Sequence, residues 1–544
     1  MSNPGPLSLR SGFSVRMGGM NASESNYWLD QIVDQAVKTY PQGEILVSSG
    51  ISPSASYHIG HFREALTADA IAWGIRRAGR QARHMHVVDN FDPLRKRYSF
   101  LPEEYEQYVG WPVCLVPDPY GCHHSYATHF TSEFEVSAAQ MGVEMDVVYS
   151  YEDQYKTGKM TPYIEQAMTK VSEIRRVFKE VAHRELSEEW VPLQILSDNQ
   201  SFNEWRYVSH DTVAKTLRYR RPDGGEGEMR YNDGRVKLNW RLDWPARWAL
   251  WGVKVEPFGK EHATKGGSYD TGAVFVREVF GSEPPLPLPY DTINLIGETK
   301  KMSSSLGNLV TPGEALEIMP AEILRYFVLR SLPKRVIYFD PGLGLYNLID
   351  EFAKVEDAVL MGGHPEFEQA YRVSTAIKQE RSVAPIAFNH LVSVYQAARG
   401  DSERVKGILK RTGYEAVVSK QWAVIERELG YVKNWIDKYA PQSVKFEVKE
   451  SLPEVDLSGE QRVFLGRLGE MVDQERDLNA QGMHDAIYAV AEQSGLKPGQ
   501  AFVAIYRVIL GQDSGPKAGW FLAELDRDWL VARLKEAGES GSKT

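Results

Sequence analysis

Short apolar runs and helical stretches alternate along the first 300 residues. Residues 44–49 (EILVSS) are β-prone and end at Gly50, and apolar positions then recur with helical spacing over 61–78, up to a C-terminal cap at Gly79. The pattern also predicts a helix over about 126–141 and strands over 84–92, 145–150, 253–259 and 292–297. Strands joined by helices at this spacing predict a Rossmann-like α/β domain with a doubly wound parallel sheet.

Two parts of the chain depart from this alternation. Residues 185–240 are rich in turn signals such as RPDGGEGEM and YNDGR, which indicates an insertion between the two halves of the α/β domain. Beyond about 340, helical periodicity replaces the strand patterns. We therefore expect an N-terminal lead-in over 1–40, the α/β domain over 41–340 and an all-helical region over 341–544.

The composition is that of a globular protein, with 42% of its 544 residues hydrophobic and 25% charged. No apolar run approaches the roughly 20 residues of a membrane helix. Two cysteines, Cys114 and Cys122, do not make a disulfide scaffold and fit a reducing cytoplasm. A net charge of −10 argues against sequence-independent nucleic-acid binding, but basic clusters at 218–221 and 404–411 allow an RNA partner.

The segment PSASYHIGH (53–61) stands where the first strand turns into the first helix. Ligands of an open parallel sheet bind beyond the carboxyl ends of its strands, and a helix N-terminus offers N–H groups and a positive dipole to phosphate. His58 and His61 add hydrogen-bond donors on one side of the first turn, and Gly60 leaves room for a nucleoside. Taken alone, the segment also fits a plain helix start with surface histidines.

A second motif, KMSSS (301–305), lies on a loop between Gly297 and Gly307. Lys301 offers a mobile positive charge to the β- and γ-phosphates, and Ser303 and Ser304 offer hydroxyl donors. Lysine and serine on a glycine-bounded loop also fit an ordinary surface loop. The two motifs together favour an ATP site at which a substrate carboxylate attacks the α-phosphorus.

Two further groups of residues have metal- or ligand-binding chemistry. Asp118, Cys122, His123 and His129 could complete a tetrahedral zinc shell, although a histidine-bearing loop that enters a helix fits the spacing equally well. Three tryptophans, Trp240, Trp244 and Trp248, lie in the segment WRLDWPARW. So many tryptophans close together are more typical of a hydrophobic core than of a ligand-binding surface. His262 and Asp270 follow a predicted strand and should face the same crevice, and Asp89 and Asp92 end another strand in the same way.

In this order the two short motifs resemble the HIGH and KMSKS signatures of class I aminoacyl-tRNA synthetases, with Ser304 in place of the second lysine. The wider match is to class I lysyl-tRNA synthetases and covers most of residues 44–350. It is carried by SGISPSASYHIGH, VVDNFDPLRK, PDPYGCHHSYATHF, RLDWPARW, EPFGKEHATKGGSYDTG, KMSSSLGN and LRYFVLRSLPKRVIYFD. The resemblance implies attachment of L-lysine to tRNA(Lys) through a lysyl-adenylate, with ATP and Mg²⁺, and a helical region that contacts the tRNA stem and anticodon. A monomer is the favoured oligomeric state.

The resemblance also assigns residues, position by position. It places ATP against Ser54, His58, Gly60, His61 and Lys301, and lysine against Gly50, Ser52, Trp240, His262 and Tyr290. We also expect Asp270, Met302, Ser303 and Ser304 at the ATP site. It places one structural zinc ion on Asp118, Cys122, His123 and His129. Relatives often carry a second, four-cysteine zinc site in the insertion, but residues 185–240 contain no cysteine, so ordinary packing must hold this insertion. Glu64 and Asp243 are candidates for the carboxylate that pairs with the lysine ε-ammonium.

Two other functions are weighed against this one. A small-molecule adenylate-forming ligase or nucleotidyltransferase needs no RNA-reading appendage, so the long helical region argues against it. A non-catalytic tRNA-binding paralogue is disfavoured because His58, His61 and Lys301 are all present.

Overall fold

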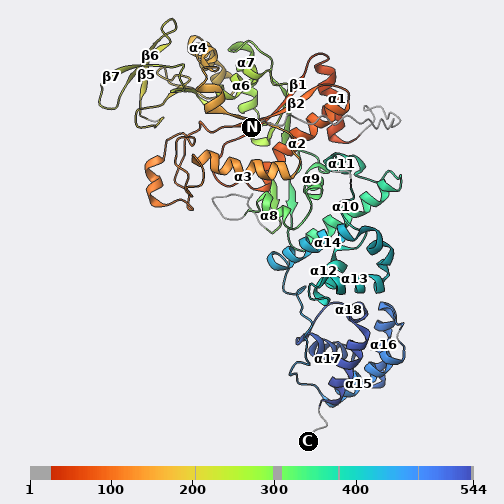
Figure 1. Ribbon diagram of the computed structural model, residues 1–544. Coiled ribbons are helices and arrows are strands. Elements are labelled where there is room, and N and C mark those ends of the chain that lie inside the picture. Colours follow the sequence, from red (N-terminus) through yellow and green to blue (C-terminus); the bar gives the residue numbers. More distant parts are fainter. Residues whose placement is uncertain (1–25, 203, 298–308, 378–379, 476, 541–544) are drawn as a thin grey trace, which may run out of the picture.

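The computed structural model describes residues 26–202, 204–297, 309–377, 380–475 and 477–540. Its main sheet has five parallel strands in the order β10–β9–β1–β2–β3 (Figure 1). The strands are β1 (Ile45–Ile51), β2 (Ala82–Val88), β3 (Asp146–Tyr149), β9 (Val255–Gly259) and β10 (Leu286–Tyr290). Because the chain extends the sheet from β1 first to one side and then to the other, the predicted doubly wound topology is confirmed.

Helices and short helical turns join these strands and cover the sheet. They are α1 (Trp28–Thr39), α2 (Ile59–Arg77), η2 (Glu103–Tyr108), α3 (Tyr126–Gln140), η3 (Ser150–Tyr155), α4 (Thr161–Thr169), α5 (Val171–Glu180), α6 (Trp240–Trp251), η4 (Lys260–Ala263), α7 (Ser268–Glu278), α8 (Pro312–Leu316) and α9 (Ala321–Leu329). The predicted helices at 61–78 and 126–141 are α2 and α3. Gly79 follows α2 with φ +81°, and Arg80 N–H donates to the Ile75 carbonyl at 3.2 Å, so the helix ends as predicted.

The fifth strand of the main sheet, β10, is not the predicted one. The predicted strand at 292–297 exists as β11 (Ile293–Leu295), but it pairs with β12 (Ile337–Phe339) in a separate two-stranded sheet. Strand β10 contains Pro287 and Pro289, which count against a strand in the sequence. The structure tolerates both because β10 is an edge strand whose Leu286 N–H donates to the sheet at 2.8 Å, so the two prolines face the open edge.

Residues 28–39 belong to the core and are not a lead-in as expected. Helix α1 buries Trp28, Leu29, Ile32, Val33 and Ala36, which recur with helical spacing along one face. The Trp28 indole N–H also donates to the Leu329 carbonyl at the end of α9, at 2.9 Å.

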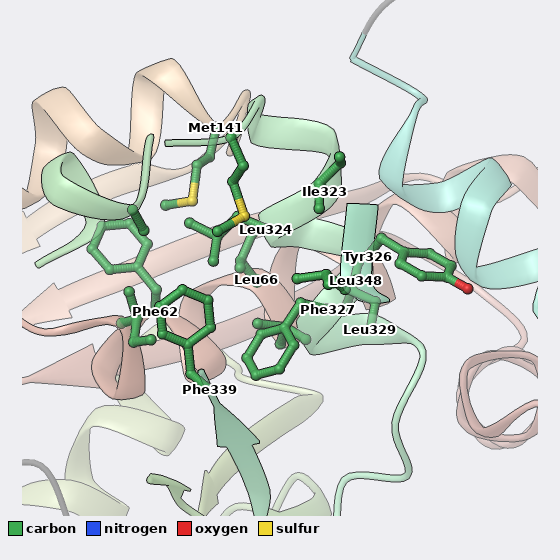
Figure 2. Packing of buried hydrophobic residues seen from close by; sticks show 14 of the residues in the cluster. Phe62, Leu66, Met141, Ile323, Leu324, Tyr326, Phe327, Leu329, Phe339 and Leu348 are labelled. Carbon is green, nitrogen blue, oxygen red and sulfur yellow. The ribbon is translucent and has the colours of Figure 1, made fainter. Parts of the chain in front are cut away.

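The main hydrophobic core lies between α2, α3, α9 and the first helix of the C-terminal region (Figure 2). Phe62 and Leu66 of α2 pack against the apolar face of α9, which includes Leu324 and Phe327. This core fixes the direction of α2, and with it the position of the histidine motif at the N-terminus of that helix.

The predicted insertion contains two small antiparallel sheets. One pairs β4 (Leu193–Ile195) with β8 (Val236–Leu238), and the other has the order β5 (Arg206–Asp211), β6 (Thr216–Arg220) and β7 (Glu226–Arg230). Trp205 and Tyr219 stack with their ring planes 3° apart and their centroids at 4.0 Å. Both residues are buried in a hydrophobic cluster, so apolar packing holds the insertion in the absence of cysteine.

The described residues beyond β12 contain helices only. These helices are α10 (Gly344–Leu360), α11 (Glu368–Ser374), α12 (Phe388–Ala397), α13 (Ser402–Leu409), η5 (Lys410–Tyr414), α14 (Glu415–Lys438), α15 (Gly459–Gln474), α16 (Ala480–Gln493), α17 (Pro498–Leu510), α18 (Ala518–Glu524) and α19 (Arg527–Glu539). Helices α10–α14 share the main core, whereas α15–α19 enclose a separate core. The molecule is therefore elongated, with α15–α19 at the end distant from the sheet (Figure 1). Among the described helices, none has the length and apolar character to cross a membrane.

Candidate active site

The histidine motif forms the start of α2, directly after the carboxyl end of β1. The Nδ1 atom of His58 accepts the Gly60 N–H at 3.1 Å, and the Nδ1 atom of His61 accepts the His58 N–H at 3.2 Å. The two rings stack with centroids 3.8 Å apart. Since Nδ1 of each ring accepts a backbone hydrogen, the proton of each neutral imidazole lies on Nε2, where it can be donated to a phosphate oxygen.

The lysine motif lies outside the described residues, together with Lys301, Met302, Ser303 and Ser304. The described residues after it do contact the histidine motif: the Ile59 N–H donates to the Val310 carbonyl at 3.0 Å. Val310 follows the KMSSS segment by five residues in the sequence. The described segment that follows the lysine motif in the sequence therefore lies beside the start of α2.

A cavity of about 240 Å³ opens beside the carboxyl ends of β1, β2 and β9. Its walls come from β1, α2, β2, α6, β9 and η4. The lining residues are Ser48, Ser49, Gly50, Ile51, Ser52, Glu64, Met85, Val87, Asp89, Trp240, Trp244, Arg247, Trp248, Val253, Glu256, Phe258 and His262. Gly50, Ser52, Trp240 and His262, which the sequence assigns to lysine binding, thus surround one cavity.

Glu64 is a half-buried carboxylate of this cavity. It accepts hydrogen bonds from the Gly50 N–H at 2.7 Å and from the Tyr290 hydroxyl. Burial raises the pKa of Glu64 to about 8, although these two hydrogen bonds favour the ionised form. Tyr290, the fifth predicted lysine-binding residue, is therefore joined to the cavity through Glu64.

A second carboxylate of the cavity, Glu256, is buried and is absent from the predicted residues. Its side chain accepts hydrogen bonds from Trp244 Nε1 at 3.1 Å, from Ser48 Oγ at 3.4 Å and from Trp248 Nε1. Burial raises the pKa of Glu256 to about 7. The signal in the sequence is a single glutamate inside the apolar strand VKVEPFG, a position at which an acidic side chain is rarely buried without a partner.

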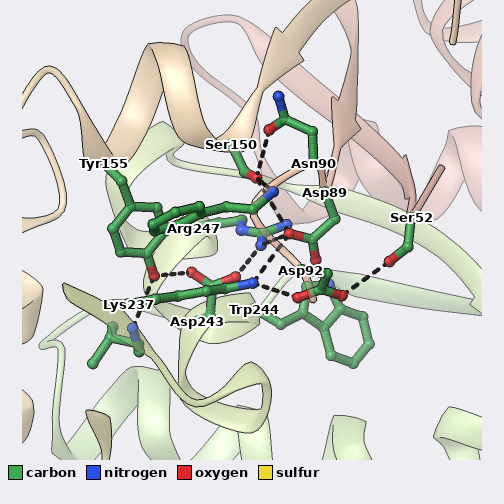
Figure 3. A network of polar contacts seen from close by, with 12 residues as sticks. Ser52, Asp89, Asn90, Asp92, Ser150, Tyr155, Lys237, Asp243, Trp244 and Arg247 are labelled. Carbon is green, nitrogen blue, oxygen red and sulfur yellow. Dashed lines mark hydrogen bonds and ion pairs between the residues drawn. The ribbon is translucent and has the colours of Figure 1, made fainter. Parts of the chain in front are cut away.

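A network of buried charges adjoins the cavity (Figure 3). Arg247 donates to Asp89 at 2.8 Å and also pairs with Asp243, while Lys237 of the insertion pairs with Asp92 and lies 3.5 Å from Asp89. Burial alone would raise the pKa of Asp89, but Arg247 and Lys237 hold it at about 2. The network joins α6, the end of β2 and the last strand of the insertion.

This network changes the interpretation of Asp243 and gives Ser52 a partner. Asp243 is fully buried, pairs with Arg247 and accepts a hydrogen bond from the Tyr155 hydroxyl, so it is not available to a ligand. Ser52 at the cavity wall donates to Asp92 at 3.1 Å. Of the two candidate carboxylates from the sequence, Glu64 alone lines the cavity.

Two residues that the sequence assigns to ATP lie outside this cavity. Ser54 is exposed on the loop between β1 and α2, where its carbonyl accepts the Tyr126 hydroxyl. Asp270 lies in the first turn of α7 and accepts the Gly266 N–H at 2.9 Å. The structure gives Asp270 a local role in the glycine-bearing loop and does not test its contact with a nucleotide.

The four predicted metal ligands converge at the N-terminus of α3. Their candidate ligand atoms all lie within 4.8 Å of one another. Cys122 Sγ lies 3.1 Å from His123 Nδ1 and 3.2 Å from His129 Nδ1, and His129 Nδ1 lies 3.3 Å from Asp118 Oδ1. Ligands of a tetrahedral zinc ion are separated by about 3.3–3.7 Å, given metal–ligand bonds of about 2.0–2.3 Å.

The Nε2 atoms of His123 and His129, on the ring edges away from the proposed metal, each have an oxygen partner. His123 Nε2 lies 2.9 Å from Ser132 Oγ, and His129 Nε2 lies 3.4 Å from Glu133 Oε1. Oxygen partners of this kind fix the ring orientation of zinc-bound histidines and leave the other nitrogen to the metal. The donor set of one sulfur, two nitrogens and one carboxylate oxygen therefore fits zinc.

Known proteins match nearly the whole chain. The family model described as "tRNA synthetases class I (K)" matches residues 26–380, and that of an "Anticodon binding domain" matches residues 439–538. A lysine--tRNA ligase of Archaeoglobus fulgidus is 39% identical, over 94% of this chain and 100% of that protein. Lysine--tRNA ligase 1 of Methanosarcina acetivorans is 37% identical, over 94% of this chain and 98% of that protein. A lysine--tRNA ligase of Pyrococcus horikoshii is 34% identical, over 94% of this chain and 100% of that protein.

The sheet, the histidine motif at its switch point and the helical C-terminal region are the architecture of a class I aminoacyl-tRNA synthetase. The chain belongs to the family of class I tRNA synthetases (K).

Proposed function

We propose that the protein attaches L-lysine to tRNA(Lys), using ATP and passing through a lysyl-adenylate. The observation that supports this most directly is a small cavity with a half-buried carboxylate, Glu64, beside the histidine motif of a class I synthetase fold. An unpaired carboxylate is costly to remove from water, so a cavity that contains one favours a cationic ligand. Lysine--tRNA ligases with 34–39% identity over nearly the full chain support the same substrate.

The proposed reaction needs positioning and charge stabilisation, without a nucleophilic side chain. The α-carboxylate of lysine attacks the α-phosphorus of ATP, the bond to the pyrophosphate oxygen breaks, and pyrophosphate leaves. The Nε2–H donors of His58 and His61, the N-terminus of α2 and the Lys301 ammonium would bind the phosphate oxygens on which negative charge develops. ATP enters as its magnesium complex, and the 2′- or 3′-hydroxyl of the tRNA then displaces AMP.

Aminoacylation of purified tRNA(Lys) with each of the twenty amino acids tests the specificity. Charging with lysine alone is expected, and charging with another amino acid would reject the proposal. A small-molecule ligase would instead form adenylate or product without any transfer to tRNA.

The role of Lys301 is tested by pre-steady-state adenylate formation in Lys301→Ala. Loss of one donor to the developing charge typically slows such a step about 10²–10³-fold. We expect this loss with little change in lysine affinity, and Lys300→Ala is the matched control. A change of only a few-fold in Lys301→Ala would contradict the role.

The ε-ammonium of lysine is proposed to pair with Glu64, whose orientation is fixed by the Tyr290 hydroxyl and the Gly50 N–H. Gly50, Ser52, Trp240 and His262 would enclose the rest of the amino acid. The position of Tyr290 behind Glu64, away from the cavity lining, makes it a positioning residue for the carboxylate.

A single structural zinc ion is proposed at Asp118, Cys122, His123 and His129. Elemental analysis of the purified protein is expected to find about one zinc per chain. His123→Ala should lose the metal, whereas His124→Ala changes the adjacent exposed histidine and should retain it. Absence of zinc from active protein would remove the proposal.

The tRNA is proposed to reach the cleft between the two helical bodies of the C-terminal region. This cleft has a volume of about 1250 Å³, and Arg411, Tyr414, Lys517 and Trp520 are among its lining residues. Aromatic rings stack on unpaired bases, and nearby cations bind phosphates. Trp520→Ala should weaken tRNA binding by about 1–3 kcal/mol while leaving the KM for lysine unchanged. Lys420→Ala, at an exposed position outside the cleft lining, is the control.

Three further properties follow from the proposal. The reaction is placed in the cytoplasm because that compartment keeps thiols such as Cys114 and Cys122 reduced. The protein is proposed to act as a monomer, which analytical ultracentrifugation tests. Lysine activation is proposed to require bound tRNA, so pyrophosphate exchange should be weak until tRNA(Lys) is added.

A further inference from the structure

The cavity contains one carboxyl group more than a single ammonium group needs. Glu64 and Glu256 both line it, and within the part of the chain that the structure describes neither carboxylate belongs to an ion pair with a lysine or arginine. Arg247 also lines the cavity, but Asp89 and Asp243 already pair with it. Burying a second unpaired carboxylate costs several kcal/mol, so its retention requires a reason.

The two carboxylates lie at different depths. Val47 of β1 pairs with Val255 of β9, which sets Ser48 beside Glu256, whereas Glu64 accepts its hydrogen bond from Gly50, two residues nearer the carboxyl end of β1. Successive residues of a strand advance by about 3.3 Å. Glu256 therefore lies at the floor of the cavity, below Glu64.

At this floor, Glu256 connects to the aromatic wall. Helix α6 presents Trp240, Trp244 and Trp248 at intervals of four residues, along one face. The two oxygens of Glu256 accept the indole N–H groups of Trp244 and Trp248, one indole on each oxygen. Trp244 in turn contacts Trp240, with centroids at 5.6 Å, and His262, at 5.5 Å.

An ionised carboxylate suits this arrangement best, and a cation in the cavity favours that form although burial raises the pKa of Glu256 to about 7. Two indole N–H groups donate to the two oxygens, and hydrogen bonds to the charged form favour that form against the cost of burial. A glutamine would offer one oxygen to one indole and would direct its own N–H₂ at the other. Position 256 therefore requires a carboxylate, and a side chain of the same shape without the charge does not replace it.

We propose that Glu256 is a positioning residue of the lysine pocket, which fixes the tryptophan wall and adds a second negative charge that holds the cationic side chain of the substrate. This inference rests on the proposed lysine specificity. Glu256 and its two indole partners form the floor of the pocket, and Glu64 provides the carboxylate nearer the carboxyl end of β1.

The test separates the charge from the hydrogen bonds. Glu256→Gln is measured in the wild-type background and in Trp248→Phe, which removes an indole N–H and with it the clash between two donors. Glu256→Asp keeps the charge on a shorter side chain, and Glu261→Gln, on the exposed turn that follows β9, is the surface control. For each variant, the KM for lysine and kcat of tRNA charging are measured, together with the melting temperature.

We expect Glu256→Gln to raise the KM for lysine about tenfold or more in both backgrounds, with kcat changed far less. Glu256→Asp should recover part of the affinity. If the loss disappears in the Trp248→Phe background, or if the KM stays at the wild-type value, Glu256 has no role in holding the cation. Both results leave the proposed function intact when the wild-type protein charges tRNA(Lys) with lysine, whereas failure of that wild-type reaction would reject the function itself.

Discussion

A single guanidinium group joins the helix of the histidine motif to the segment that leads toward the lysine motif. Arg63 of α2 is almost completely buried and donates to four backbone carbonyls: those of Asp291, Thr292, Leu332 and Pro333. Burial lowers its pKa to about 10, yet the group remains charged at neutral pH. Its contacts hold the start of β11 against α2, so Arg63 supports the site without touching the cavity.

Replacement of Arg63 by methionine should therefore destabilise the protein strongly. The change removes four hydrogen bonds from a charged donor, and a hydrogen bond to a charged group contributes about 1.5–3 kcal/mol. We expect the free energy of unfolding to fall by about 3 kcal/mol or more in urea titrations. Arg77→Met, at an exposed position near the end of the same helix, should change it far less. Equal effects of the two substitutions would contradict this account.

Glu64 gives the stability of the protein a defined pH dependence. Burial raises its pKa from 4.5 to about 8, so between these values the folded state binds more protons than the unfolded state. This group therefore lowers the free energy of unfolding progressively as the pH rises from about 4.5 to 8. Glu64→Gln removes the effect, and the variant should gain stability relative to wild type as the pH rises.

Urea midpoints of both proteins at pH 5, 6.5 and 8 measure this gain. If the difference in urea midpoint between Glu64→Gln and wild type stays constant or decreases over this pH range, the pKa of Glu64 is not raised.

At the residue level, the sequence predicted the parts of the site whose motif chemistry is local. The sequence places His58 and His61 at a helix start after the first strand, as the structure has them, and their contact with phosphate stays a prediction. Asp243 and Glu256 could not be told apart, because each is an acidic residue in an apolar setting. Their difference is tertiary: Asp243 meets Arg247, whereas Glu256 meets two indoles and the cavity.

Among the elements, the predictions failed where packing overrides local preference. Prolines in β10 are incompatible with a central strand, and only the position of β10 at the sheet edge makes them acceptable. Helix α1 has apolar positions with helical spacing in WLDQIVDQAVKT, so this part of the expected lead-in forms a packed helix. The small antiparallel sheets β4–β8 and β5–β6–β7 lie within residues 185–240, where the turn signals that indicate the insertion are local.

The three-stranded sheet β5–β6–β7 should be sensitive to its aromatic pair. Trp205 is buried and stacks on Tyr219, so Trp205→Ala removes a large contact from a small cluster. A cost of about 3–5 kcal/mol is expected for such a truncation. Hydrogen exchange should accelerate in β5–β7 and remain slow in β1 and β2. Val213→Ala, at a side chain that is 92% exposed, is the control, and chelators should not affect this sheet.

For the whole molecule, the core boundaries divide the helical region that the sequence places over 341–544. Helices α10–α14 extend the main core to Ala440, and the separate core of α15–α19 begins at Val448. The two bodies meet through polar contacts, including Ser393 Oγ to Glu524 at 2.7 Å and His390 to Glu524 at 3.2 Å. The sequence could not locate this boundary because both sides are helical and amphipathic.

A truncation after Pro441 should therefore leave a folded synthetase body. It removes the separate core without opening the main one, so we expect a cooperative melting transition and retained lysine binding, with loss of tRNA affinity. A truncation after Asp350 should aggregate, because it removes α11–α14 and most of α10 from the main core. Stable folding of the shorter fragment would contradict the shared core.

The tryptophans of α6 give the protein its own optical probe. The indoles of Trp240 and Trp244 lie nearly parallel, with planes 19° apart. Aromatic rings so close share their electronic excitation, which produces a paired positive and negative band in ultraviolet circular dichroism. Any molecule that enters the cavity and disturbs this wall alters the band, so filling of the pocket can be followed in unlabelled protein during a titration.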